Sequence, residues 1–407
     1  MPKFPGIDLN GIFTMTKLRD ADAIKDLIIP DRAKRAVVIG AGLIGLEMAE
    51  ALVSRRLSVT VVEALDTLLP ALLDYEIAAF VEKSLHERGV TFLPGQRVTG
   101  FEGDSGHNVR SVVTEERSLE ADLVIMAIGV KPDVGLARDA GIEIGTTGGI
   151  SVDKYLRTSD PDIYAGGDCV ENTHRITGQK VLVPLGSTAN KHGRVIGTNI
   201  TGGKETFPGV LGTAAVKVFN CNVGRVGLNE SQAKEAGYDV VTCIAPDNEH
   251  ASYYPGAKPI VVKLVADKQN GKLLGGQVVG SGDTAKRVDV LVTALTFGAG
   301  VEDLSELDLA YAPPYNSAMD PLHNAANIIR NKLSGYADAL SPMEVKKKID
   351  NGDDFILLDV RRNIELMENR IDARQLKHIP VQELRARTDE LPRNAEIVIY
   401  CQRSVRA

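Results

Sequence analysis

The chain has 407 residues, enough for several domains, and its 43% apolar and 25% charged residues are ordinary for a globular protein that is not embedded in a membrane. Its formal net charge of −7 argues against non-specific binding to nucleic acid or to an anionic membrane, and no apolar run is long enough to span a bilayer. Four cysteines (Cys169, Cys221, Cys243 and Cys401) without a C-x-x-C pair argue against a disulfide scaffold and against a metal site. These properties predict a cytoplasmic protein.

The first predicted elements follow an opening stretch that looks unstructured. Residues 1–30 begin with the Pro- and Gly-rich sequence PKFPGIDLNGIF, which predicts a linker. The β-branched apolar run at 36–39 predicts a buried parallel strand, and the helical spacing of apolar residues over 43–55 predicts a helix directly after it. A second strand is expected over 59–62.

Glycines between this strand and this helix predict a dinucleotide site. Gly40, Gly42 and Gly45 follow the order G-x-G-x-x-G: the first permits a tight turn, the second lets a pyrophosphate approach the backbone, and the third lets the helix pack on the strand. Glu63 ends the second strand, where a carboxylate accepts hydrogen bonds from an adenosine ribose. Because this charge repels a 2′-phosphate and the next two residues offer no cation, the sequence favours NADH over NADPH.

The pattern of strands and helices then continues. It predicts an amphipathic helix over 74–88 with Gly89 as its C-cap, a strand over 90–93, a small antiparallel meander over 97–119, and a buried strand running into a Gly/Pro turn over 121–133.

The segment TSDPDIYAGGDC (158–169) is the next motif, and we expect a strand to deliver its carboxylate, Asp168. With the upstream AIGVKP, which contains Gly129, it resembles the second flavin motif of the pyridine nucleotide-disulfide oxidoreductases. The resemblance implies that Asp168 hydrogen-bonds the ribityl chain of FAD. An ordinary turn with a capping Asp is the simpler alternative.

The same resemblance implies further cofactor contacts. VPLGSTANKHGRVIG (183–197) would form a helix whose N-terminus, with Leu185, Thr188 and Ala189, faces the flavin pyrimidine and stabilises negative charge there. Glu47, in the helix after the glycines, would lie between nicotinamide and flavin. An exposed helix Glu without a role is the alternative for Glu47.

Residues 205–335 change in character and resemble the family's dimerisation domain. Strands such as 214–219 and 259–265 alternate with helices such as 231–236 and 284–298. The stretch YAPPYNSAMDP (311–321) has no His before its prolines, which points to the single-cysteine branch of the family.

Within that branch, the tyrosines of this region look most like those of the coenzyme A-disulfide reductases. Together with the upstream HASYYPGAK (250–258), the YAPPY sequence implies that Tyr253 and Tyr311 reach across a homodimer to the partner's thiol. A phenol is a reasonable proton donor to a leaving thiolate. Tyrosines are also common interface anchors, so a purely structural role stays open.

The last seventy residues form a separate unit. Ser341 and Glu344 predict a capping box, FILLDVR (355–361) a buried strand, and EIVIYCQRSVRA (396–407) a strand delivering Cys401. Cys401 with Arg406 resembles the rhodanese loop, in which C-x-x-x-x-R wraps backbone N–H groups around sulfur. Such a nest and its guanidiniums would lower the thiol pKa and bind anionic sulfur substrates. Ser404 stands where many relatives have Gly.

Two parts that the resemblance leads us to expect are not in the sequence. Relatives begin with an FAD half-domain carrying a first G-x-G-x-x-G and the redox cysteine, and nothing before Gly40 matches either. The sequence also stops soon after Cys401, where a rhodanese needs a closing helix. We therefore expect a fragment cut at each end, which binds NADH, binds FAD poorly and lacks the thiol chemistry of its parent.

The expected fold class is α/β, with a Rossmann-like NAD(P)-binding domain inserted in an FAD-binding domain. The expected parts are the NAD(P)-binding domain with its linker (1–129), the second half of the FAD-binding domain (130–204), an α+β dimerisation domain (205–335) and a truncated α/β rhodanese domain (338–407). The expected parent enzyme uses NAD(P)H and FAD to reduce a coenzyme A disulfide or persulfide. The alternatives are an NADH oxidase or peroxidase and, for the fragment, a nucleotide-binding module without turnover.

Overall fold

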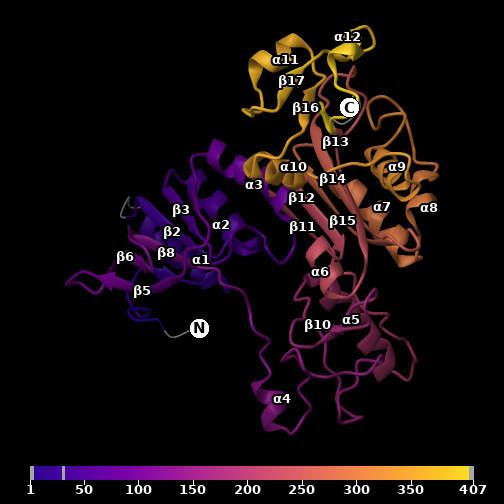
Figure 1. Ribbon diagram of the computed structural model, residues 1–407. Helices are drawn as coiled ribbons and strands as arrows, with labels where there is room; N and C mark the ends of the chain where they lie inside the picture. The colour runs from indigo at the N-terminus through magenta and orange to yellow at the C-terminus, as the bar shows by residue number, and fades with distance from the viewer. Residues whose placement is uncertain (1–3, 30–32, 403–407) are drawn as a thin grey trace.

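Two five-stranded sheets organise the chain, as the computed structural model of residues 4–29 and 33–402 shows (Figure 1). The first is fully parallel, with the strand order β1-β8-β2-β3-β4. Its strands are β1 (Ile12–Phe13), β2 (Arg35–Ile39), β3 (Ser58–Val62), β4 (Thr91–Leu93) and β8 (Leu123–Met126). Its helices are α1 (Leu18–Ile28), α2 (Leu43–Ser54) and α3 (Tyr75–Glu87). The strands and helices predicted for this sheet between residues 35 and 126 are thus confirmed, with small shifts at their ends.

The predicted N-terminal linker is wrong for residues 4–29, which are folded. Ile12 pairs with β8, and α1 buries Ile24, which is only 4% exposed, in the core of the same lobe. The Phe4 ring packs edge-on against Phe101, with 6.0 Å between ring centroids. The glycines that suggested a linker lie in tight turns with positive φ, and the apolar residues between them supply the packing.

The predicted antiparallel meander is confirmed. It consists of β5 (Val98–Gly103), β6 (Val109–Thr114) and β7 (Ser118–Glu120), paired in that order. Its apolar residues share a core with one face of the parallel sheet, so the meander belongs to the N-terminal lobe.

Residues 127–204 form a lobe with little regular structure, drawn in magenta at the bottom of Figure 1. Its elements are α4 (Gly135–Asp139), β9 (Asn172–Thr173), β10 (Lys180–Val181) and α5 (Gly186–Ile200). The strand expected before Asp168 is not formed. This segment makes only isolated bridges, Arg157 to Tyr164 and Ile150 to Val170, because the glycines turn the chain, with φ +85° at Gly167.

The second sheet is antiparallel, with the order β11-β12-β15-β14-β13. Its strands are β11 (Ala214–Val218), β12 (Cys221–Gly227), β13 (Val240–Asn248), β14 (Pro259–Asp267) and β15 (Leu273–Gly280). The accompanying helices are α6 (Glu230–Glu235), α7 (Ala285–Thr296), α8 (Val301–Ser305) and α9 (Pro321–Leu333). The predicted helices and strands of this region are confirmed.

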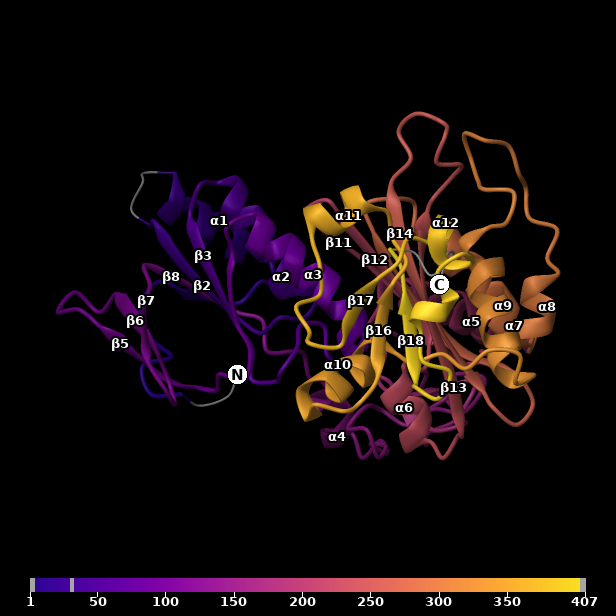
Figure 2. The same cartoon turned by 45° about the horizontal axis from the view of Figure 1, so that its top comes forward.

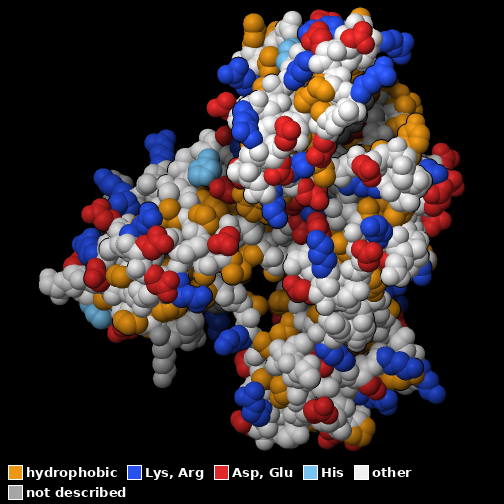
Figure 3. Space-filling view, in the orientation of Figure 1, with side chains coloured by type: hydrophobic (Ala, Val, Ile, Leu, Met, Phe, Trp, Pro, Cys, Tyr) orange, Lys and Arg blue, Asp and Glu red, His pale blue; other side chains and the backbone are white. Residues whose placement is uncertain are grey.

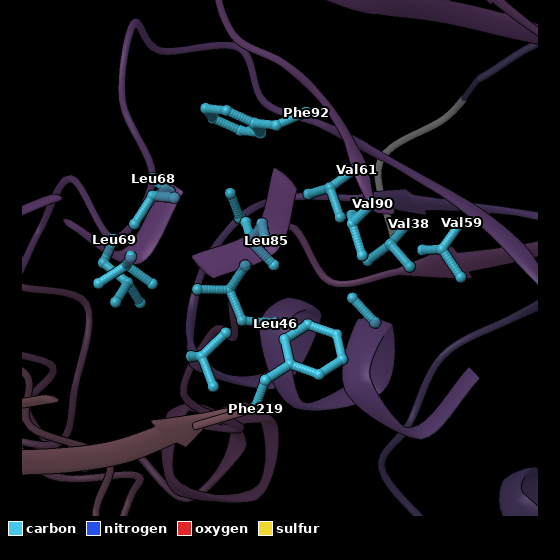
Figure 4. Close-up of a cluster of buried hydrophobic side chains, with 14 of the residues drawn as sticks. Val38, Leu46, Val59, Val61, Leu68, Leu69, Leu85, Val90, Phe92 and Phe219 are labelled. Carbon is cyan, nitrogen blue, oxygen red and sulfur yellow. The ribbon is translucent and has the colours of Figure 1, made fainter. Parts of the chain in front are cut away.

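Alternate residues of this sheet enter two different cores, as the period of a strand requires. Val262 and Val278 join the core under α7 and α9, whereas Val261 and Val279 join the core that contains α2 and α3. In Figure 4, Phe219 lies beside Leu46 of α2. The N-terminal lobe and the antiparallel sheet therefore pack through one continuous apolar core.

A buried charge cluster at this junction was not foreseen from the sequence. The Lys263 ammonium, with its side chain 1% exposed, lies 2.8 Å from Glu230, 3.1 Å from Asp74 and 3.2 Å from Glu76. Gln277 donates to Asp74 at 2.6 Å and accepts from its backbone N–H at 2.8 Å. Because Asp74 is the N-cap residue of α3 and Glu76 lies in its first turn, the cluster ties that helix to β14 and β15.

The C-terminal unit has a three-stranded parallel sheet with β16 (Ile356–Asp359) between β17 (Leu376–His378) and β18 (Ile397–Tyr400). Its helices are α10 (Pro342–Asn351), α11 (Asn363–Glu368), α12 (Val381–Leu384) and a short 3-10 turn, Thr388–Glu390. The capping box is confirmed, since Ser341 N–H donates to Glu344 at 2.6 Å and Glu344 N–H donates to Ser341 at 3.2 Å. Of the helices in residues 4–29 and 33–402, none has the length and apolar character needed to cross a membrane.

Candidate active site

The first candidate site is the turn between β2 and α2, where two glycines are required by packing. Gly40 has φ +101°, and a Cβ there would lie 2.4 Å from the carbonyl oxygen of Ala127. A Cβ at Gly45 would lie 1.9 Å from the carbonyl oxygen of Gly40. The tight turn and the close helix–strand approach predicted for these two residues are therefore present in the structure.

Gly42 differs, because a Cβ added at this residue would point into open space. Apart from Gly42 itself and its neighbours in the chain, no described atom lies within 4 Å of the position that a Cβ would take there. Gly42 is also the N-cap of α2, and no side chain of the described chain caps that helix or places an acid in its first turn. Free N–H groups and the positive end of a twelve-residue helix thus face an approachable surface, which fits a pyrophosphate.

Glu63 and Gly129 both lie beside this turn. The Glu63 carboxylate accepts hydrogen bonds from the N–H of Ala41 at 2.8 Å and of Leu65 at 3.0 Å, so it is held at the rim of the glycine turn. Gly129 is exposed, has φ +95°, and follows closely after Ala127, whose carbonyl touches Gly40. The carboxyl ends of β2, β3 and β8 therefore bring these predicted residues together, at the edge of a parallel sheet where ligands bind.

Glu47 is exposed on α2, with its side chain outside the helix face that packs on the sheet. The exposed Ile44 precedes it by three residues, so both lie on one side of the helix. This placement suits either of the two roles considered for Glu47.

The second candidate site is the loop at Asp168 with the first turn of α5. Asp168 is exposed, and the adjacent Gly167 approaches Ala189, since a Cβ at Gly167 would lie 3.8 Å from the Ala189 Cβ. Leu185 is the N-cap of α5 and Thr188 is buried in its first turn. The described residues place no acid in this turn and no capping side chain on the helix. The four predicted residues are thus gathered, and the free helix N-terminus fits an anionic group.

His192 supports this loop and was missed by sequence reasoning. Its Nδ1 accepts a hydrogen bond from the N–H of Gly167 at 3.0 Å, and its ring stacks edge-on against Phe207 at 4.4 Å. The side chain is fully buried, and burial lowers the pKa of His192. A neutral His that accepts at Nδ1 carries its proton on Nε2. Only its place one turn after Ala189 could have pointed to it.

The third candidate site is a pair of exposed phenols. Tyr253 and Tyr311 lie on two long loops beside the antiparallel sheet, which rise side by side in Figure 2, and their hydroxyls are 3.3 Å apart. Tyr253 is 75% exposed and Tyr311 50%. The hydrogen bond to Tyr311 raises the pKa of Tyr253. The structure therefore brings together two tyrosines that are far apart in the sequence.

The fourth candidate site is Cys401 at the end of β18. Cys401 is half-buried and packs against the core of the C-terminal unit. Beside it, Tyr400 donates a hydrogen bond to Asp359 at 2.7 Å, and Asp359 also binds Arg361 at 2.8 Å. Burial, together with the hydrogen bond to Asp359, raises the pKa of Tyr400 to about 12. Arg406, predicted to complete the loop, lies outside the described residues.

The other three cysteines have environments that disfavour a thiolate. Burial raises the pKa of Cys221 to about 11 and that of Cys243 to about 12. Burial also raises the pKa of Cys169, which follows Asp168. A nucleophilic thiol needs the opposite shift, so these environments do not favour the three residues as nucleophiles.

The four sites belong to different parts of the fold. The glycine turn belongs to the N-terminal lobe and Asp168 to the lower lobe, with an open gap between the lobes in the space-filling view (Figure 3). The tyrosine pair and Cys401 belong to the antiparallel sheet and the C-terminal unit. Among residues 4–29 and 33–402, no group of three or more His, Cys, Asp or Glu could hold a metal ion.

Comparison with known proteins gives a consistent assignment. Residues 1–193 match the family described as pyridine nucleotide-disulphide oxidoreductase, and residues 213–323 match the dimerisation domain of that family. The chain is 38% identical over 330 residues to the NAD(P)H sulfur oxidoreductase (CoA-dependent) of Pyrococcus furiosus, covering 81% of this chain and 74% of the relative. It is 37% identical over 337 residues to the NADH oxidase of Methanocaldococcus jannaschii, covering 82% and 74%.

A solved structure extends the likeness to the whole chain. The NAD-dependent persulfide reductase from A. fulgidus has a TM-score of 0.94 and 45% identity, and the match covers 100% of this chain and 73% of that one. The glycine turn between β2 and α2 and the loop at Asp168 lie within the segment that matches the family, and the antiparallel sheet lies within the segment that matches its dimerisation domain. The chain belongs to the pyridine nucleotide-disulphide oxidoreductases.

Proposed function

We propose that this chain takes part in an NAD(P)H- and FAD-dependent reduction of a coenzyme A disulfide or persulfide, with NADH as the favoured donor. The open cradle at Gly42 carries this proposal, because it pairs an approachable backbone with a free helix N-terminus. The names of two relatives, a CoA-dependent sulfur oxidoreductase and a persulfide reductase, support the substrate class.

The cofactor-binding residues divide between two cradles. Gly40, Gly42 and Gly45 would hold the pyrophosphate of NADH, and Glu63 its adenosine ribose, where its charge disfavours a 2′-phosphate. Asp168 and the first turn of α5 would hold FAD. When bound there, FAD would supply the two-electron chemistry that links oxidation of NADH to reduction of the sulfur substrate.

The tyrosine pair would serve the substrate end of the reaction. In coenzyme A disulfide reduction, NADH and one proton yield NAD⁺ and two coenzyme A thiols. With the persulfide, NADH and one proton yield NAD⁺, one coenzyme A thiol and hydrogen sulfide. Tyr253 and Tyr311, sharing one hydrogen bond in an exposed position, would donate a proton to the leaving thiolate.

The domain division and assembly follow from the same proposal. The NAD(P)-binding domain would comprise residues 1–129, with 4–29 as a folded part of it, and residues 130–204 the second half of the FAD-binding domain. Residues 205–335 would form the dimerisation domain of a homodimer, so that each tyrosine pair serves the partner's site.

The C-terminal unit, residues 338–407, would be a rhodanese-like sulfurtransferase. Its parallel sheet delivers Cys401 from a strand end, and the buried pair of Asp359 and Arg361 supports that strand end through Tyr400. Cys401, with Arg406, would carry persulfide sulfur to or from the reductase.

The test compares electron acceptors. NADH consumption by the FAD-loaded enzyme is measured with coenzyme A disulfide, coenzyme A persulfide and oxygen. We expect turnover with the disulfide or persulfide and little with oxygen. Preference for oxygen would instead support an NADH oxidase, the activity named for the Methanocaldococcus jannaschii relative. Absence of turnover with every acceptor would leave a nucleotide-binding module.

A further inference from the structure

A buried arginine lies beneath the two loops that carry the tyrosine pair. Arg287, in the first turn of α7, is 1% exposed, and its Nη2 lies 3.1 Å from Asp320, which is also 1% exposed. The guanidinium donates hydrogen bonds to the carbonyl oxygens of Asp283, at 3.2 Å, and of Glu249. Glu249 begins the loop of Tyr253, so the arginine holds that loop at its base.

Asn316 connects the arginine to the second loop. Its side-chain oxygen accepts a hydrogen bond from Arg287 at 3.1 Å, and its amide nitrogen donates to the carbonyl oxygen of Ala310 at 3.3 Å, directly before Tyr311. Its backbone carbonyl accepts from the N–H of Ala251 at 3.2 Å, two residues before Tyr253. Asn316 is itself 1% exposed, and it therefore joins both loops and the arginine in one buried network.

We propose that Arg287 and Asn316 form a bracket that sets the position of the Tyr253 hydroxyl relative to the Tyr311 hydroxyl. They are positioning residues, since their contacts are with the loop backbones and not with the phenols. The inference deepens the proposed function and rests on it for the catalytic use of the tyrosines. The structural part of the inference, that Arg287 and Asn316 hold the two loops, depends only on their hydrogen bonds to those loops.

Physical chemistry favours a positional role for this arginine over a purely stabilising one. A cation in the first turn of a helix is disfavoured by the helix dipole, and a buried ion pair often adds little net stability. A guanidinium offers five N–H donors in one rigid plane, so it can fix several carbonyl groups at once. Lysine retains the charge but cannot reproduce that fork.

The experiment uses Arg287→Lys and Asn316→Ala in the whole chain labelled with 3-fluorotyrosine. The signals of Tyr253 and Tyr311 are assigned among the ten tyrosines from Tyr→Phe variants. The readout is the change in the ¹⁹F shift of Tyr253 when Tyr311→Phe removes its hydroxyl partner. Arg330→Lys is the matched control, because Arg330 pairs with Glu302 in the same domain without contacting either loop.

We expect Tyr311→Phe to move the Tyr253 signal in the parent chain and in Arg330→Lys, but not in Arg287→Lys or Asn316→Ala. Retention of that response in folded Arg287→Lys and Asn316→Ala would overturn the bracket. If Arg287→Lys does not fold, Asn316→Ala alone decides, because it leaves the Arg287–Asp320 ion pair in place.

A kinetic arm separates this inference from the proposed function. In the FAD-loaded enzyme, the bracket variants should lower kcat with coenzyme A disulfide about 10- to 100-fold, since small misplacements of reacting groups have effects of this size. NADH-dependent reduction of ferricyanide, which needs no proton donor, should be unchanged. A lost ¹⁹F response with unchanged disulfide turnover would keep the bracket and remove the tyrosines from the mechanism.

Discussion

Two glycines of one turn should respond to the same substitution in opposite ways. Gly42→Ala adds a methyl group where, apart from Gly42 itself and its neighbours in the chain, no described atom lies within 4 Å, at a residue with φ −81° and ψ −172° that alanine also adopts. Gly45→Ala adds it 1.9 Å from the carbonyl oxygen of Gly40. The first should therefore affect ligand binding and the second the fold.

The sizes of the two effects follow from these contacts. At Gly42, replacing glycine by alanine as an N-cap costs less than about 1 kcal/mol of stability. The methyl would meet the pyrophosphate, and we expect a loss of NADH affinity of about 10- to 100-fold, or about 1.4 to 2.8 kcal/mol. At Gly45, the overlap with a backbone oxygen forces the helix away from the strand, and overpacking of this kind costs about 1–3 kcal/mol or more.

The assay pairs NADH titration, followed by nucleotide fluorescence, with urea unfolding of both variants. Gly42→Ala should unfold close to the parent midpoint and bind NADH weakly, whereas Gly45→Ala should unfold at lower urea. Parent-like NADH affinity in Gly42→Ala would refute the placement of the pyrophosphate at this turn. Parent-like stability of Gly45→Ala would refute the packing argument.

Three other predictions test separate parts of the molecule. Lys263→Met removes the buried ammonium that Asp74, Glu76 and Glu230 share, and it should lower stability to urea by about 3–5 kcal/mol at neutral pH. Burial raises the pKa of Glu230, but the hydrogen bonds from Lys234 and Lys263 lower it, and the net pKa lies below the usual value. The stability that the ionised Glu230 contributes is therefore lost as the pH falls through its pKa in the folded protein. The loss of unfolding free energy in Lys263→Met, relative to the parent, should thus become smaller at acidic pH. A loss that does not change with pH would contradict this reasoning. Glu63→Ala should raise the affinity for NADPH relative to NADH about tenfold in parallel titrations, because a like charge is removed; an unchanged ratio would place the 2′-phosphate elsewhere. Cys401→Ser should abolish sulfur transfer from thiosulfate while NADH oxidation continues, and unaffected transfer would exclude Cys401 from the chemistry.

The nucleotide cradle could be predicted because each of its signals is local. Gly40, Gly42 and Gly45 follow one another in a single G-x-G-x-x-G run directly after a strand, and Glu63 follows the end of the next strand in sequence. A short window of the chain therefore contains the strand, turn, helix and acid together. The family resemblance supplied the roles of residues such as Asp168, which local patterns do not specify.

The features that sequence reasoning missed depend on partners that are distant in the chain. Lys263 meets carboxylates from α3 and α6, and Arg287 joins backbone groups from two separate loops. A lysine in a strand or an arginine in a helix has no local pattern that predicts its burial. The linker prediction for residues 4–29 was wrong because it gave weight to the local turn residues. The apolar residues between those turns pack into the core.

The most direct test of the central claim counts electrons and thiols in the absence of oxygen. The FAD-loaded enzyme is given NADH and coenzyme A disulfide under argon, and the amount of NADH consumed is compared with the amount of thiol released. The account predicts two coenzyme A thiols for each NADH and a rate that air does not increase. Consumption of NADH only in air, without thiol release, would contradict it.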